Sequence, residues 1–441
     1  MGACCTKDYM FGGHMPYDKD EGDSNVGEDG EEVRRGEDGA IVRLNGSSAF
    51  SSMFTQRGKK GINQDAMTVW EDFTGEKDLV FCGVFDGHGP SGHRVARRAR
   101  EMLPSKLSKA IKKQPSRLAN GVSEASVGPD YSGGNPLVSR WETVLVDSFQ
   151  EMDQELGFDS SVDSFCSGTT AVTVIKQGEY LVVANLGDSR AVLCTRGDKN
   201  QQIAIQLTVD HKPNIPCETE RIQNCNGRII AEKDDPDIYR VWVPDEDYPG
   251  LAMSRSFGDF CLKDYGLIST PHVSYRKLTR KDEFIVLATD GIWDVLTNKQ
   301  VINIVSSARN RSMAAKLLVK LAVREWKRRY PGALVDDCAV ICLFFKSPPM
   351  LTRSMTSVGR QNARSHPELA VSRSCRSMRM GKRGGEEGGG GAAAAKKESK
   401  DDWNAVQGLK RVNSLTRIPR FTRALSNNQK MEKVFHGVEA R

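Results

Sequence analysis

The sequence predicts an α+β fold in which two antiparallel sheets pack face to face and helices cover their outer faces. Short runs rich in Val, Ile and aromatic residues recur along the chain, as is typical of strands. Several of these runs are joined by connections too short for the crossover that parallel strands need. Longer segments with a helical period lie between the strands, which favours layered sheets and helices over a doubly wound parallel sheet.

The expected strands include one clear hairpin. Glu179 lies in a short turn between two strand-like runs, which indicates antiparallel pairing of its neighbours. A further strand is expected at Met67–Trp70, directly after Asn63–Gln64–Asp65. The other expected strands are Leu79–Phe85, Thr169–Ile175, Tyr180–Leu186, Arg190–Thr195, Gln202–Leu207, Phe284–Thr289 and Cys338–Phe345.

Helices are expected where apolar residues recur with a period of about 3.6 residues. The pattern runs from Pro136 to Leu156, and it returns at Val301–Val305 and Met313–Trp326. Thr297 and Gln300 have the spacing of a capping box, which places the start of one of these helices at Thr297.

Charge divides the chain into three parts. Residues 1–40 hold 4 Lys and Arg against 11 Asp and Glu, whereas residues 351–441 hold 19 against 8. The acidic segment 1–40 and the basic, Gly- and Ser-rich tail 348–441 are predicted to be disordered. The folded domain is therefore predicted to span residues 41–347.

Composition excludes several classes of protein. No stretch reaches the roughly 18 apolar residues of a membrane-spanning helix, and the first residues lack the features of a secretory signal. Cys82, Cys194, Cys338 and Cys342 lie inside apolar runs, which predicts reduced core cysteines. The basic tail favours anionic lipid or an acidic partner, although a solvated tail is the simpler interpretation. It lacks the features of a nucleic-acid module, so no nucleic acid is expected.

Acidic residues lie at the ends of several expected strands. Asp86, Asp188 and Asp290 each follow one strand-like run, while Asp65 and Asp336 each precede another. A single Asp at a strand end is most often a turn or capping residue. Four or five strand ends with the same chemistry indicate carboxylates that converge and repel one another in a cleft.

A hard divalent cation relieves such repulsion. Carboxylates, a backbone carbonyl and water are the ligands that Mg²⁺ and Mn²⁺ prefer, and the chain has no Cys/His set with zinc spacing. Two such ions bridged by one Asp would generate a hydroxide nucleophile and stabilise a displacement at phosphorus. Asp294 lies four residues after Asp290 and shares its face if a helical turn begins there.

At these residues the chain resembles the metal-dependent type 2C protein serine/threonine phosphatases, the PPM family, and in particular its plant branch. The resemblance rests on seven segments that occur in the family's order and cover almost all of the predicted domain. They are VFDGHG (84–89), SGTTA (167–171), NLGDSR (185–190), DHKP (210–213), LAMSRSFGD (251–259), ATDGIWD (288–294) and DDCAV (336–340). The family's fold is a four-layer α-β-β-α sandwich with a dinuclear metal site at one edge, which agrees with the predicted layers.

The resemblance implies a role for each acidic position. Asp86 would bridge two Mg²⁺ or Mn²⁺ ions, and the carbonyl of Gly87 would bind one of them. Asp290 and Asp336 would hold the other ion, and Asp65 would contact metal-bound water.

Two further features follow from the same resemblance. A third, weaker metal site would use Asp188 and Asp294 together with Asp290. His88 would be the general acid that protonates the departing seryl or threonyl oxygen, since imidazole titrates near neutral pH. The alternative is a histidine at a helix start that hydrogen-bonds a nearby carboxylate.

Three positions depart from the pattern of many members. Lys60 stands where many have an Arg that binds substrate phosphate, and since Lys lacks the bidentate fork, its grip would be looser or shared with Arg57. Gln64 stands in place of Glu and removes a charge near the metals. Asp337 stands in place of Asn, and it either restores that charge or points away.

The predicted function is hydrolysis of phosphoserine and phosphothreonine in proteins by a metal-bound hydroxide. The substitutions at the three departing positions motivate an alternative, a pseudophosphatase or scaffold that binds phosphoproteins without turnover. The retained Asp86, Asp290 and Asp336 argue against that alternative.

The insertion Asp234–Gly250 falls where the family has its flap beside the cleft. Tyr239 and Trp242 either contact substrate there or pack locally and bury the base of the loop. The segments Ser254–Arg255–Ser256 and Gly258–Asp259 are expected to be architectural.

The N-terminus matches a lipidation pattern. Gly2 followed by Thr6 fits N-myristoylation, and Cys4 and Cys5 are candidates for palmitoylation. Since one acyl chain gives only marginal membrane binding, a second signal from the cysteines or the basic tail matters. We therefore expect a monomer at the cytoplasmic face of the plasma membrane, with a cytosolic or nuclear pool; the alternative is an unmodified N-terminus.

Overall fold

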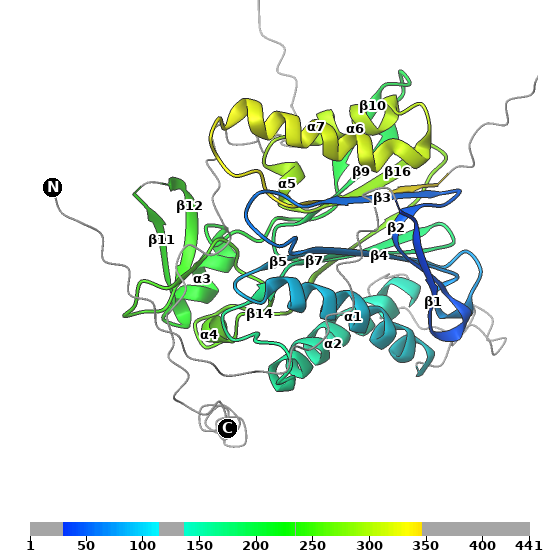
Figure 1. The fold of residues 1–441 in the computed structure, drawn as a ribbon. Helices are drawn as coiled ribbons and strands as arrows, with labels where there is room; N and C mark the ends of the chain where they lie inside the picture. The colour runs from blue at the N-terminus through cyan, green and yellow to red at the C-terminus, as the bar shows by residue number, and fades with distance from the viewer. Residues whose placement is uncertain (1–29, 114–135, 234, 346–441) are drawn as a thin grey trace, which may run out of the picture. The chain divides into compact units, whose positions relative to one another are not determined.

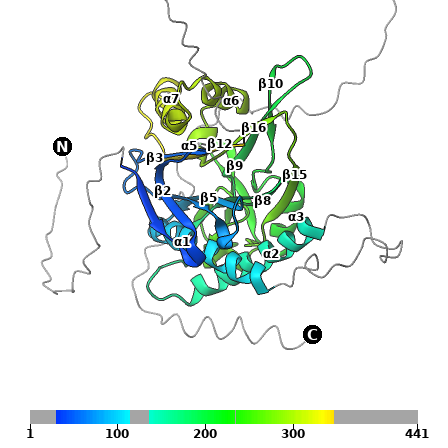
Figure 2. The same cartoon turned by 90° about the vertical axis from the view of Figure 1, so that its right-hand side faces the viewer.

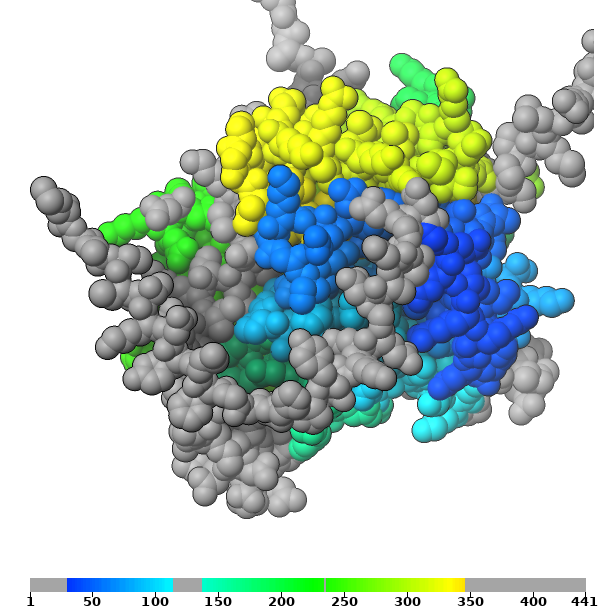
Figure 3. All heavy atoms as spheres, viewed as in Figure 1, coloured from blue at the N-terminus to red at the C-terminus, as the bar shows by residue number. Residues whose placement is uncertain are grey.

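Two antiparallel sheets stack face to face, and a pair of helices covers the outer face of each (Figure 1). The computed structural model describes residues 30–113, 136–233 and 235–345. The same order of layers is visible after a quarter turn (Figure 2). In the space-filling view the yellow spheres of the C-terminal helices rest directly on the blue spheres of the N-terminal strands (Figure 3).

The two sheets are joined through one strand that pairs in both. The first sheet contains β1 (Glu32–Arg35), β2 (Ile41–Ser47), β4 (Asp65–Glu71), β5 (Val80–His88), β7 (Ala171–Gln177), β8 (Tyr180–Leu186) and β15 (His272–Lys277). The second contains β3 (Ser51–Gln56), β9 (Arg190–Arg196), β10 (Gln202–Gln206), β16 (Asp282–Ala288) and β17 (Cys338–Phe344). The start of β2 pairs with β4 and its end pairs with β3, so the hydrogen-bonded path folds back on itself there.

Four longer helices form the outer layers. Helices α1 (Gly92–Lys113) and α2 (Pro136–Phe158) cover the first sheet, and α6 (Asn298–Ser307) and α7 (Ala314–Arg329) cover the second (Figure 1). The predicted capping box is confirmed, since Thr297 Oγ1 accepts from the Gln300 amide and the Gln300 side chain accepts from the Thr297 amide.

Strand β5 shows why the sequences of the central strands are almost continuously apolar. Phe81 and Phe85 point into the core shared with α1 and α2, whereas Cys82 and Val84 point into the core between the sheets. All four side chains are buried, because the strand has a covered face on both sides. The cysteines predicted in apolar runs are free and buried. This double burial fixes the strand end that carries Asp86.

A smaller subdomain projects from one end of the sandwich. It consists of α3 (Pro216–Asn224) and a three-stranded sheet of β11 (Arg228–Glu232), β12 (Asp235–Trp242) and β13 (Pro249–Leu251) (Figure 1). We call this subdomain, residues 216–251, the flap. The predicted polar insertion is therefore not an irregular loop, because its segments pair as strands.

The predicted start of the folded part at residue 41 is late. Residues Glu32–Arg35 form β1, which pairs with β2. Backbone pairing and the ion pair of Glu31 with Arg43 stabilise this segment rather than apolar burial, so its acidic composition did not reveal it. None of the described helices is both long and apolar enough to cross a membrane. Gly2, Cys4, Cys5, residues 114–135 and the basic tail lie outside the described residues.

Candidate active site

The structure brings together the carboxylates that the sequence places at strand ends. Asp65 begins β4 and pairs directly with Asp86 in β5. Burial raises the pKa of Asp86 well above its usual range, and the negative charges of Asp290, Asp65, Asp336 and Asp188 raise it further. These five acidic residues therefore share one electrostatic site.

Thr170 holds the backbone of Asp86 on both sides. The Asp86 amide donates to Thr170 Oγ1 at 3.0 Å, and the Thr170 amide donates to the Asp86 carbonyl at 2.9 Å. Thr170 Oγ1 also lies 2.7 Å from the hydroxyl of Ser189, the residue after Asp188. This buried chain links the positions of Asp86 and Asp188, a role for the SGTTA segment that the sequence did not reveal.

Gly87 lies in a space that no side chain can enter. A Cβ at this position would come within 2.6 Å of the Gln64 carbonyl and would collide with the Gly92 carbonyl. The close approach of these two backbone segments therefore requires glycine at this position.

Asp65 is held by a threonine from the other sheet. Thr289 Oγ1 donates to Asp65 Oδ2 at 2.8 Å and accepts from the Ala339 amide at 3.0 Å. Burial raises the pKa of Asp65 well above its usual range, and the charge of Asp337 adds to the effect. Thr289 is a second residue whose role sequence reasoning missed.

The side chains of Asp337 and Gln64 form hydrogen bonds with the backbone around the site. Asp337 accepts from the Gly58 amide at 2.6 Å and from the Gln64 amide at 2.9 Å, so both its oxygens anchor the loop after β3. The Gln64 side chain donates to the Gly89 carbonyl at 2.8 Å. Asp337 is thus an anchor whose charge still acts on Asp65.

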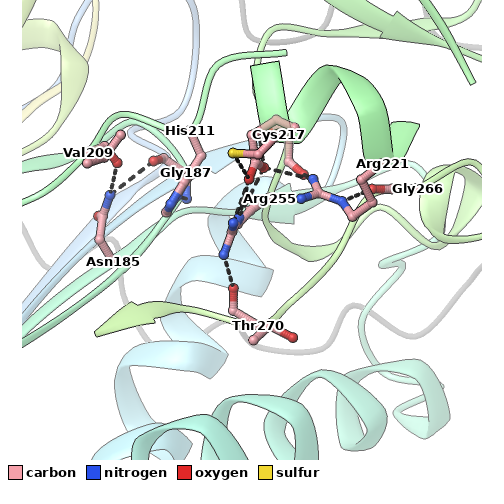
Figure 4. Close-up of polar contacts among 11 residues, drawn as sticks. Asn185, Gly187, Val209, His211, Cys217, Arg221, Arg255, Gly266 and Thr270 are labelled. Carbon is pink, nitrogen blue, oxygen red and sulfur yellow. Dashed lines mark hydrogen bonds and ion pairs between the residues drawn. The ribbon is translucent and has the colours of Figure 1, made fainter. Parts of the chain in front are cut away.

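Hydrogen bonds with the DHKP segment (210–213) hold the turn that carries Asp188 in place (Figure 4). The Gly187 amide donates to Nδ1 of the buried His211 at 3.3 Å, and the His211 amide donates to the Gly187 carbonyl at 2.9 Å. The Asn185 side chain donates to the same carbonyl at 3.2 Å and to the Val209 carbonyl at 2.8 Å. Desolvation lowers the pKa of His211 to about 3, so its imidazole is a neutral acceptor.

Asp294 lies one helical turn beyond Asp290, as predicted. Helix α5 (Asp290–Trp293) begins at the first carboxylate, and the Asp294 amide donates to the Asp290 carbonyl at 2.9 Å. Burial lowers the pKa of Arg190, but the charges of Asp210, Asp294 and Asp188 outweigh this and raise it. Asp294 and Asp188 therefore act on the same guanidinium.

His88 is buried and hydrogen-bonded to Asp259. Its Nε2 lies 2.6 Å from Asp259 Oδ2, and Ser256 Oγ donates to the same oxygen at 2.6 Å. Both side chains are almost fully buried. Asp259, expected to be architectural, is therefore the direct partner of the proposed acid.

Two lysines contact carboxylates of the site. Lys60 Nζ lies 2.5 Å from Asp336 Oδ2, and Lys212 forms an ion pair with Asp188. Across residues 30–113, 136–233 and 235–345, no three His, Cys, Asp or Glu side chains stand close enough together to hold a metal ion as they are placed.

The two aromatic residues of the flap, Tyr239 and Trp242, differ in their burial. Trp242 is buried and its indole N–H donates to the Ile230 carbonyl at 3.0 Å, which is the local packing alternative. Tyr239 is 42% exposed and remains available to a ligand.

Two arginines tie the base of the flap to the sandwich (Figure 4). Arg255 and Arg221 both bind the buried carboxylate of Glu218 in α3, and Arg255 also donates to the Thr270 carbonyl at 2.9 Å. Glu218 thus fixes the helix that supports the flap.

The donor atoms, though not their present spacing, are of the kind that a hard divalent cation takes. The converging ligands are carboxylate oxygens, and Asp86 Oδ2 is buried without a hydrogen-bond partner. Mg²⁺ and Mn²⁺ prefer oxygen ligands of this kind.

The chain is similar to known phosphatases. The family profile described as Protein phosphatase 2C matches residues 49–327. The chain belongs to the protein phosphatase 2C family. Probable protein phosphatase 2C 73 of Oryza sativa subsp. japonica is 49% identical over 402 residues, which cover 89% of this chain and 92% of that protein. Probable protein phosphatase 2C 65 of Arabidopsis thaliana is 50% identical over 374 residues, which cover 83% and 96%.

A solved structure of the same family confirms the predicted fold. The serine-threonine phosphatase 2C from Toxoplasma gondii superposes with a TM-score of 0.61 at 25% identity, covering 72% of this chain and 100% of that chain. The predicted resemblance to plant type 2C phosphatases is confirmed, and so is the enzyme class, a metal-dependent protein-serine/threonine phosphatase.

Proposed function

We propose that this type 2C phosphatase hydrolyses phosphoserine and phosphothreonine in proteins at a site of two divalent ions. Asp86 with Gly87, Asp290 and Asp336 would hold the two ions, and Asp188 and Asp294 would contribute to a third. The observation that carries the proposal is the convergence of four other carboxylates on the buried Asp86, whose pKa they raise. Divalent ions supply an activated nucleophile and neutralise charge on the phosphoryl group.

The chain's own residues complete the site. Asp65, held by Thr289, accepts a hydrogen bond from the attacking water and orients it. His88 donates a proton to the departing seryl or threonyl oxygen, while Asp259 holds its imidazole in place. Because Lys60 contacts Asp336, the exposed Arg57 in the same loop is the better placed partner for substrate phosphate.

A metal-dependence assay tests this proposal against the pseudophosphatase alternative. Chelator-treated full-length protein should release phosphate from a phosphoserine peptide only after Mn²⁺ or Mg²⁺ is added. Binding of the phosphopeptide without release of phosphate at millimolar Mn²⁺ would instead support the scaffold alternative, which the contacts of Lys60, Gln64 and Asp337 motivate.

We also propose that the enzyme is tethered to the cytoplasmic face of the plasma membrane. The support is the N-terminal pattern of Gly2, Cys4, Cys5 and Thr6 together with the basic tail, all outside the described residues. A Gly2→Ala variant should lose membrane association in cell fractionation, and retention equal to wild type would contradict the tether.

A further inference from the structure

Lys60 is held against a carboxylate that the proposed metal site needs. Its ammonium lies 2.5 Å from Asp336 Oδ2, with the two side chains 19% and 15% exposed. A lysine at this distance neutralises the carboxylate in the same place where a cation would bind it.

Backbone hydrogen bonds of the loop after β3 position Lys60 for its contact with Asp336. The Lys59 amide donates to the Val335 carbonyl at 2.8 Å, and the Gly58 amide donates to Asp337 Oδ1 at 2.6 Å. A Cβ on Gly58 would lie 2.6 Å from the Asp336 carbonyl, so only glycine allows the loop to approach this closely. The backbone contacts of the loop therefore hold Lys60 next to Asp336, and the contact does not depend on the length of the lysine side chain alone.

The ammonium and a divalent ion cannot both occupy the same carboxylate oxygen. The charge of Asp336 raises the pKa of both Asp65 and Asp86, so either cation at Asp336 relieves this repulsion. Because both side chains are partly exposed, Lys60 has an open path to solvent when an ion arrives. The lysine is thus a competitor that can be displaced, not a permanent ion-pair partner.

We propose that Lys60 competes with the divalent ion for Asp336 and so weakens metal binding at this carboxylate. The inference rests on the proposed metal site. Lys212 stands in the same relation to Asp188, so the site has a lysine at each of two ligands. A phosphatase built this way responds to changes in free divalent ion over a higher concentration range than one without the lysine.

The test is a direct measurement of Mn²⁺ binding that needs no catalysis. Full-length, chelator-treated protein is titrated with Mn²⁺, and free Mn²⁺ is measured by its electron paramagnetic resonance signal. Lys60→Gln should bind Mn²⁺ about three- to tenfold more tightly than wild type, because a partly buried ion pair no longer has to break.

Lys59→Gln is the matched control. Lys59 is the neighbouring residue, carries the same charge, is exposed, and makes no ion pair with any residue that the structure describes. The Mn²⁺ affinity of Lys59→Gln should stay within about twofold of wild type, because solvent screens the exposed charge of Lys59. Equal tightening in both variants would overturn a specific role for Lys60.

Two further outcomes contradict the inference. Weaker Mn²⁺ binding by Lys60→Gln would mean that Lys60 positions Asp336 for the ion. Unchanged binding together with a raised KM for phosphopeptide would mean that Lys60 binds substrate. Asp86→Asn separates these results from failure of the metal site itself, since wild type must bind Mn²⁺ and this variant must lose that binding.

Discussion

The hydrogen bond between the buried side chains of His88 and Asp259 determines which imidazole nitrogen is left to transfer a proton. Nε2 is engaged by Asp259, and Nδ1 has no hydrogen-bond partner among the residues that the structure describes. The two interpretations of His88 are therefore compatible, because the carboxylate contact orients the ring for a second proton contact. Asp259 escaped sequence reasoning since it lies 171 positions from its partner.

Substitutions in this pair should slow the step that needs a proton. His88→Ala should lower kcat for a phosphoserine peptide by roughly 10²- to 10⁴-fold with Mn²⁺ binding retained. Asp259→Asn should give a smaller loss in the same direction. The loss should be much smaller for p-nitrophenyl phosphate, whose leaving group needs no proton. Equal losses on both substrates, measured by steady-state kinetics, would rule out the acid role.

His211 should make stability depend on pH. Burial lowers its pKa from 6.5 to about 3, so the folded protein keeps it neutral while the unfolded chain protonates it. The unfolded state then binds more protons between these values, so stability that is present above pH 6.5 is lost as the pH falls toward 3. From about pH 7.5 to 5.5 the loss should be roughly 1.4 kcal/mol.

Urea unfolding of wild type and His211→Asn checks this difference. Asn retains an acceptor for the Gly187 amide but does not titrate, so its stability should fall less than that of wild type across the same pH range. Other titrating groups are common to both proteins and cancel. Parallel pH curves for the two proteins would show that His211 does not contribute.

At the scale of elements, the sequence predicted those with strong periodicity and missed those without it. Strand β8 and helix α2 lie where the apolar pattern placed them, although α2 extends two residues further. Helix α1 was missed because its buried face includes small residues such as Ala96 and Ala99 between several arginines. Strand β12 was read as part of a polar insertion because its exposed positions include Pro236 and Asp237, which interrupt the apolar pattern of a strand.

The flap should depend on the buried carboxylate of Glu218. Glu218→Gln leaves Arg221 and Arg255 without a counter-charge, and should destabilise the protein by roughly 2–4 kcal/mol in urea unfolding. Glu179→Gln is the control, because its ion pair with Lys277 at 3.9 Å is exposed. That control should change stability by less than about 0.5 kcal/mol. Equal small effects would show that the arginines do not depend on Glu218.

At the scale of the whole molecule, three apolar cores hold the layers in register. One lies between the sheets and one lies under each helix pair. This arrangement places the ends of β5, β8 and β16 and the start of β17 at one edge, where the acidic residues converge. The sequence predicted which residues converge, since the motifs carry them. It did not predict the supporting contacts of Thr170, Thr289 and Lys60, because these join segments that are far apart in the sequence.

In the proposed mechanism, hydrolysis depends on divalent ions that Asp86 would hold. Asp86→Asn has nearly the same shape and removes only the charge, so the fold should persist by circular dichroism. The most direct test is phosphate release from a phosphoserine peptide in Mn²⁺ buffer by wild type and this variant. We expect Mn²⁺-dependent release by wild type and a loss of at least about 10³-fold in the variant. Undiminished turnover by Asp86→Asn would contradict it.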